Sequence, residues 1–180
     1  MRNVALGFGL AFGPWLVGCT TVTQISGGLS TTAAGVNGST GGAVNVHVEQ
    51  GVAGDDSVLA AGGGLRGRFA SRMQAVALAP SLSAMWSVRP MSVYGRVGPE
   101  LTLEKFDSTF YASPGGFAEL GVGVPLSTKE VKRSDGTRGT TSRLLLTLSG
   151  TLEYDIRATR RDDAFASVLL GLAYTSIPSL

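Results

Sequence analysis

Hydrophobic and polar residues alternate along much of this chain, most clearly in the segment RLLLTLSGTLEYDIR at 143–157. Apolar side chains occupy one set of alternate positions there: Leu144, Leu146, Leu148, Leu152, Tyr154 and Ile156. Polar side chains occupy the positions between them: Thr147, Ser149, Thr151, Glu153 and Asp155. A period of two residues is typical of a β-strand whose two faces meet different surroundings.

The same alternation recurs more loosely elsewhere, and turn-forming residues separate the runs. The pattern predicts strands at 43–53, 57–70, 73–89, 91–106, 110–126, 142–157 and 163–177. Long consecutive strands with tight connections predict an all-β fold, most simply an antiparallel up-and-down β-barrel. Bacterial membrane barrels have an even number of strands, so a barrel of about eight strands needs one more, which residues 20–30 could supply.

Residues 19–42 are rich in Ser, Thr and Gly and show little periodicity. This composition is typical of a flexible tether. The expected organisation is therefore a leader at 1–18, a tether at 19–42 and a β-barrel domain at 43–180.

Alternation alone does not say which face of the barrel is apolar. A small soluble barrel turns its apolar face inward, whereas a membrane barrel turns it outward and has a polar lumen. The segment at 143–157 fits either arrangement.

Two features favour the membrane arrangement. Charged residues fall on the polar face in mid-strand, beside glycines and without lysine, which suits a narrow lumen that holds paired Arg and carboxylate groups. The predicted lumen charges are Arg66, Arg68, Arg96, Glu100, Glu119 and Glu153. Aromatic residues lie near predicted strand ends, where the aromatic girdles of a membrane barrel lie: Phe69, Trp86, Tyr94, Phe106, Phe110, Tyr111, Tyr154, Phe165 and Tyr174, with Phe117 in mid-strand.

Composition narrows the class of protein. A chain of 180 residues suits one domain, and a net charge of +2 without clustered Lys and Arg argues against nucleic-acid binding. The glycines of GGGLRG at 62–67 match a dinucleotide-binding spacing, but a strand rather than a helix is predicted to follow them. His47 is the only histidine, and no nucleophile-elbow motif accompanies it. We therefore expect no enzyme activity, no cofactor and no metal site.

The N-terminus has the parts of a secretory signal. Arg2 precedes an apolar run from Val4 to Val17, which is too short to span a membrane as a helix. Small residues then lead to Cys19, the only cysteine, which has no partner for a disulfide within the chain.

Leu16, Val17, Gly18 and Cys19 resemble the lipobox of bacterial lipoproteins. The resemblance covers about 20 residues and implies cleavage between Gly18 and Cys19. It also implies a diacylglycerol thioether and an amide-linked acyl chain, such as palmitate, on Cys19. Several acyl chains hold a protein on a membrane much more firmly than one. Thr20 follows the cysteine where Asp favours inner-membrane retention, so the resemblance implies the outer membrane of the cell envelope.

The barrel domain resembles small outer-membrane β-barrel proteins, through its strand pattern rather than through a motif. We therefore expect a lipid-anchored outer-membrane barrel with a structural or interaction role. The alternative is a lipid-tethered periplasmic soluble barrel that binds a small apolar ligand. Expected partners are the membrane, through the acyl chains and the barrel exterior, and a protein or lipopolysaccharide, through the basic loop at 127–141.

Overall fold

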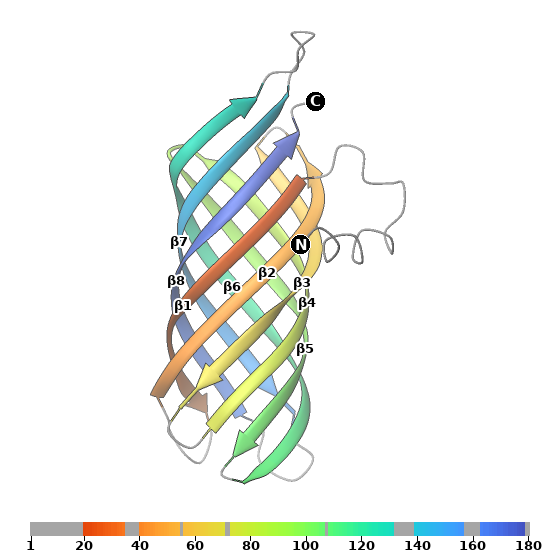
Figure 1. Cartoon of the computed structure of the whole chain (residues 1–180), viewed down its shortest axis with the longest axis vertical. Coiled ribbons are helices and arrows are strands. Elements are labelled where there is room, and N and C mark those ends of the chain that lie inside the picture. The colour runs from red at the N-terminus through yellow and green to blue at the C-terminus, as the bar shows by residue number, and fades with distance from the viewer. Residues whose placement is uncertain are drawn as a thin grey trace, which may run out of the picture.

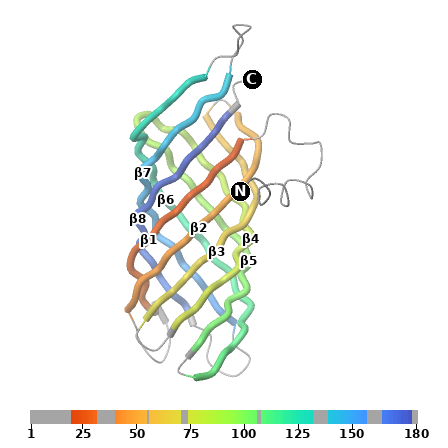
Figure 2. The backbone as a smooth tube through the Cα atoms, in the orientation of Figure 1, coloured from red at the N-terminus to blue at the C-terminus, as the bar shows by residue number. Residues whose placement is uncertain are grey.

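The computed structural model describes residues 20–34, 40–54, 56–70, 73–106, 108–131, 139–156 and 163–178. Within them the chain forms eight antiparallel strands in a closed ring, in which each strand pairs with its sequence neighbours and β1 pairs with β8. Figure 1 shows the strands tilted steeply around one axis, and Figure 2 follows the same path as a tube. The strands are β1 Thr20–Ala34, β2 Thr40–Ala53, β3 Ser57–Phe69, β4 Met73–Val88, β5 Met91–Phe106, β6 Thr109–Val131, β7 Thr140–Asp155 and β8 Asp163–Pro178.

The prediction of an all-β, antiparallel up-and-down barrel of about eight strands is confirmed. The prediction of a tether is wrong for residues 20–34 and 40–42, which lie in β1 and β2, and the alternative that residues 20–30 supply the eighth strand is confirmed. The inward face of β1 is mostly polar, with Gln24, Ser26 and Ser30 buried. Its outward face is not uniformly apolar, because threonine and glycine occupy positions 21, 23 and 27 there, so this strand lacks a strong contrast between its faces. Its alternation is therefore weak in the sequence although its pairing is complete.

The apolar face of the barrel points outward. On β7, the leucines at 144, 146, 148 and 152 are exposed, together with Tyr154. The polar residues between them, from Thr147 to Asp155, are buried inside the ring. The same alternation holds on β2, where the valines at 44, 46 and 48 are exposed and Asn45, His47 and Glu49 are buried. No helix in the described part of the chain is long and apolar enough to cross a membrane.

The barrel has two rims. We call the rim where β1 begins and β8 ends the terminal rim, and the other the opposite rim. Exposed aromatic side chains lie toward both: Trp86 and Tyr174 near the terminal rim, and Phe69, Phe110 and Tyr154 near the opposite rim. This is the distribution of two aromatic girdles.

The girdle prediction is wrong for two aromatic residues. Tyr94 and Phe165 occupy inward positions and are buried in the lumen, as is the mid-strand Phe117. Tyr111 is half-buried at the opposite rim, and the side chain of Phe106 lies outside the described residues. Proximity to a strand end does not reveal whether a side chain lies on the inner or the outer face of the barrel. That depends on whether its position along the strand is odd or even.

The band between the girdles has the height of a bilayer core. Leu144 pairs with Tyr174, and Tyr154 lies ten residues further along β7. At a rise of ~3.3 Å per residue and a tilt of ~45°, this stretch spans ~23 Å along the barrel axis, close to the ~25 Å apolar band of membrane barrels.

The β6–β7 hairpin extends beyond the terminal rim, as the top of Figure 1 shows. Residues 124–131 of β6 are exposed on both faces and pair with β7 as far as Val131 and Thr140. The predicted loop at 127–141 is therefore partly strand, and its residues 132–138 lie outside the described residues. We call 124–131 and 140–143 the ribbon.

A charge placed in the middle of the outer face should strongly destabilise a barrel in lipid. We expect Leu148→Arg to lower the free energy of unfolding by about 2–4 kcal/mol, because arginine is costly at the bilayer midplane. The measurement is urea unfolding of the protein folded into phospholipid vesicles. The matched control is Leu126→Arg in the ribbon, with an expected loss below about 1 kcal/mol. Equal losses at the two positions would contradict a lipid-facing band.

Candidate functional site in the barrel lumen

The lumen holds an unusual concentration of buried charge. All six predicted lumen residues occupy inward positions and are at least 95% buried: Arg66, Arg68, Arg96, Glu100, Glu119 and Glu153. They come from β3, β5, β6 and β7. Because inward positions recur every second residue, closure of the ring brings these distant segments together in one interior.

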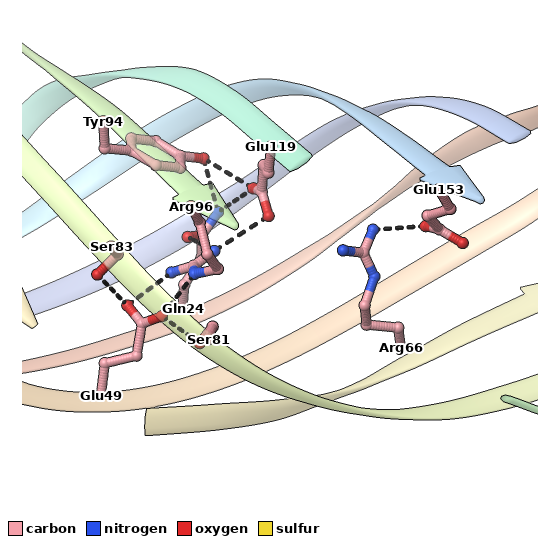
Figure 3. A network of polar contacts seen from close by, with 9 residues as sticks. All are labelled: Gln24, Glu49, Arg66, Ser81, Ser83, Tyr94, Arg96, Glu119 and Glu153. Carbon is pink, nitrogen blue, oxygen red and sulfur yellow. Dashed lines mark hydrogen bonds and ion pairs between the residues drawn. The ribbon is translucent and has the colours of Figure 1, made fainter. Parts of the chain in front are cut away.

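The first group of contacts surrounds Arg96 on β5. Its Nε and Nη2 atoms donate to the two carboxylate oxygens of Glu49, at 2.7 and 3.0 Å. Its Nη1 atom donates to Oε2 of Glu119 at 3.0 Å and to Oε1 of Gln24 at 3.1 Å. Figure 3 shows the guanidinium between these three partners. A two-pronged bond to a carboxylate fixes the orientation of an arginine as well as its position.

Neutral donors satisfy the remaining carboxylate oxygens of this group. Ser81 and Ser83 donate to Glu49 at 2.6 and 2.8 Å. Gln24 donates to the Tyr94 hydroxyl at 2.8 Å, and that hydroxyl donates to Oε1 of Glu119 at 3.2 Å. We call these residues, with Arg96 and Glu49, the Arg96 cluster. It joins side chains from β1, β2, β4, β5 and β6.

The second group lies nearer the opposite rim. Arg66 pairs with Glu153 at 2.5 Å, and Arg68 pairs with both Glu153 and Asp155, at 3.1 and 2.6 Å. We call these four residues the Arg66–Arg68 cluster. The two arginines belong to β3 and the two acids to β7, which are four strands apart in a ring of eight. These ion pairs therefore cross the full width of the lumen.

Aromatic rings cover the two arginines of this cluster. The Arg66 guanidinium carbon lies 4.3 Å from the centre of the Phe117 ring, and that of Arg68 lies 3.8 Å from the centre of the Phe165 ring. Both distances suit cation–π interactions, which gain strength in desolvated surroundings. These contacts explain why two aromatic residues point into an otherwise polar lumen.

Both carboxylate oxygens of Glu100 and both ring nitrogens of His47 are buried without a hydrogen-bond partner among the described residues. Glu100 is the one predicted lumen charge that forms no direct ion pair there. His47 lies against Phe117, with ring centres 5.9 Å apart. No triad forms around His47 in the described structure, since neither nitrogen meets a nucleophile or an orienting carboxylate.

Sequence reasoning missed several partners in the lumen: Gln24, Glu49, Asp155 and the hydroxyl of Tyr94. Glu49 and Asp155 lie at inward positions of predicted strands, so the odd–even position along each strand could have identified them. Gln24 lies in the segment interpreted as a tether, and Tyr94 was assigned to a girdle.

The lumen leaves little space for a ligand. Near the Arg96 cluster a cavity of about 20 Å³ is lined by residues that include Gln24, Glu49, Tyr94 and Arg96. It has room for about one water molecule. Toward the terminal rim, Val22, Val58 and Ala60 pack together with their apolar neighbours in place of charged groups.

The glycines of the 62–67 motif lie within β3, where no helix follows. A Cβ atom added to Gly64 would lie 2.5 Å from the His47 ring and 2.3 Å from the carbonyl oxygen of Val46. Glycine is therefore needed here for close packing against the neighbouring strand.

The described residues bear on a metal site but do not include the lipidation site. The described residues contain no group of three or more His, Cys, Asp and Glu side chains that could hold a metal ion. The lipobox residues Leu16, Val17, Gly18 and Cys19 lie outside the described residues.

Known proteins resemble this chain in fold rather than in sequence. No family model matches it, and no curated protein sequence matches it. Among solved structures, neisserial surface protein A aligns with a TM-score of 0.58 and 11% identity, over 88% of this chain and 97% of that one. Ail, the attachment invasion locus protein of Yersinia pestis, aligns with a TM-score of 0.46 and 13% identity, over 88% of this chain and 98% of Ail. The likeness to the neisserial protein shows that this chain has the fold of a small eight-stranded outer-membrane barrel.

Removing the central arginine should destabilise the barrel more than removing the whole cluster of charges. We expect Arg96→Met to cost about 3–5 kcal/mol, because it leaves Glu49 and Glu119 buried without their cation. Adding Glu49→Gln and Glu119→Gln should restore most of that loss, since no unpaired charge then remains. Urea unfolding in vesicles measures both. If the triple variant is no more stable than Arg96→Met, the pairing does not account for the cost.

Proposed function

We propose that this protein is an integral outer-membrane β-barrel with a structural or interaction role and no catalytic activity. One observation carries the proposal: the barrel is apolar outside and charged inside. Large apolar side chains on every strand are exposed, while the arginines and carboxylates of the two lumen clusters are buried. A continuous apolar exterior of this kind suits hydrocarbon, and closure of the ring satisfies the backbone groups that lipid cannot.

The soluble alternative does not fit this arrangement. It requires the face from Leu144 to Ile156 to point inward around an apolar ligand, and that face points outward. Soluble monomers rarely expose apolar patches larger than a few hundred Å². The described lumen contains ion pairs and a cavity for about one water molecule in place of a binding pocket.

A lipid anchor on Cys19 is the second part of the proposal. The lipobox at 16–19 supports cleavage after Gly18 and acylation of Cys19. Cys19 directly precedes Thr20, the first residue of β1, so the anchor would join the barrel without an intervening tether. The mature protein would then be anchored in the outer membrane by both its acyl chains and its barrel exterior.

The proposed role is an interaction rather than conduction. Side chains that cross the lumen, such as Arg66 to Glu153, leave no room for an open pore at this strand number. The ribbon is the largest described element outside the apolar band, and it carries exposed Lys129 and Glu130. An anchor in the inner leaflet would turn the terminal rim and the ribbon toward the periplasm. A periplasmic protein is then the proposed partner, because lipopolysaccharide lies on the other side of the membrane.

The membrane proposal is tested by a variant that cannot be lipidated. We expect the Cys19→Ala protein to remain in the membrane fraction after carbonate or urea extraction. On an SDS gel it should migrate differently before and after boiling, because a closed barrel has no free edge from which unfolding can begin. A soluble protein without this shift would overturn the proposal, whereas the wild type would stay on the membrane through its lipid in either case.

Orientation and lipidation are tested together by thiol labelling of intact cells. We expect Ser108→Cys, at the opposite rim, to react with a large membrane-impermeant maleimide, and Thr128→Cys, in the ribbon, to react only after permeabilisation. The reverse result would place the ribbon outside the cell. The wild type is the control: a thioether at Cys19 has no free thiol, so the denatured wild-type protein should not react. Labelling of the denatured wild type would contradict lipidation.

A further inference from the structure

The outer surface of the barrel has a groove over β1. The groove has a volume of about 510 Å³ and opens toward the surroundings of the barrel. Its lining comes from β1, β2, β7 and β8 and includes Thr23, Ile25, Gly27, Val44, Leu170 and Tyr174.

Two of the three outward residues of β1 in the groove are small: Thr23 and Gly27 lie on either side of Ile25, whose exposed side chain is part of the lining. Gly27 pairs with Val44 of β2 on one side and Leu170 of β8 on the other. Both neighbours are exposed and rise above a position that has no side chain. At Gly27 the groove is therefore a hollow between the side chains of two neighbouring strands, which suits a narrow apolar chain.

We propose that an acyl chain carried by Cys19 lies in this groove. The inference rests on the lipidation proposed above and adds a binding site on the barrel itself. Cys19 directly precedes β1, the strand that forms the floor of the groove. Thr23, where the groove lining begins on β1, pairs with Tyr174 of the aromatic girdle. Cys19 is thus only four residues before Thr23 along the chain.

The depth of the groove in the membrane fits within one lipid leaflet. From Thr23 to Gly27 the strand advances ~13 Å, or ~9 Å in depth at a tilt of ~45°. Half of a ~30 Å hydrocarbon core is ~15 Å, so an acyl chain entering at the girdle passes the whole groove within its own leaflet.

Tethering favours this chain over other occupants. In lipid, an apolar contact gains little from hydrophobicity, because the surroundings are equally apolar, and shape and packing decide what binds. Several chains attached to one residue beside the mouth are held close to the groove at all times. A second copy of the barrel would need an interface of roughly 1,200 Å² or more to bind stably, whereas the groove presents a narrow hollow between side chains.

Photo-crosslinking identifies the occupant. Cells are grown with a palmitate analogue that carries a diazirine near its methyl end, and the wild-type protein is irradiated in its own membrane. We expect the tryptic peptide that begins at Cys19 to be joined to the peptide 162–180, which contains Leu170, Leu172 and Tyr174. This product should exceed joining to any peptide from β4 or β5, across the barrel, several-fold.

A matched pair of variants tests whether the groove is responsible. A Cβ atom added to Gly27 would lie 3.5 Å from the nearest atom, the Ala43 carbonyl oxygen, so the backbone accepts a side chain there and Gly27→Leu places apolar atoms in the groove. Gly150 on β7 is also exposed and has nothing within 4 Å of an added Cβ atom. We expect Gly27→Leu to reduce crosslinking to 162–180 several-fold and Gly150→Leu to leave it unchanged.

The outcomes separate this inference from the proposed function. If mass spectrometry shows that the Cys19 peptide carries no acyl chain, the proposed lipidation is wrong. An acylated peptide joined evenly to all strands, or unaffected by Gly27→Leu, would overturn the groove and leave lipidation intact. Free phospholipid adducts on 162–180 would assign the groove to bilayer lipid, and a crosslinked dimer would assign it to a second copy. Either result would also overturn the inference.

Discussion

Closure of the ring between β1 and β8 is the constraint on which the whole structure depends. A sheet edge in hydrocarbon would leave a row of backbone donors and acceptors without partners, each at a cost of several kcal/mol. Pairing from Thr21–Ser176 to Ala34–Ala164 removes that edge. β1, the strand that completes the ring, has weak alternation of polar and apolar residues in its sequence. Closure requires its backbone hydrogen bonds more than it requires particular side chains.

Closure also creates a confined interior in which charges must find partners. Buried ions are tolerated only where opposite charges and hydrogen bonds replace water. Arg96 meets this condition through two carboxylates and an amide, and Arg68 through two carboxylates and an aromatic ring. The polar lumen is therefore a packed core made of ion pairs, and it holds the barrel wall from within while the outer face meets an apolar solvent.

The sequence predicted the strands well because alternation is a local signal, and a lumen of paired charges followed from charges on the polar face. Which arginine pairs with which acid could not be predicted. Arg66 reaches Glu153 only because the registers of all the intervening strands add up to place them at one height. Tyr94 and Phe165 show that position along a strand does not identify the face on which a side chain lies. Residues 20–34 show that hydrophobic contrast fails as a signal where threonine and glycine occupy much of the outward face.

The ion pairs that cross the lumen also constrain the number of strands in the barrel. Outer-membrane barrels can differ in size by whole hairpins, and the diameter grows with the number of strands. Here Arg66 and Arg68 on β3 meet Glu153 and Asp155 on β7, directly across the ring. An inserted hairpin would move these partners apart by more than a side chain can span, and it would leave several buried charges without an ion-pair partner. The crossing pairs thus fit a ring of eight strands and no wider one.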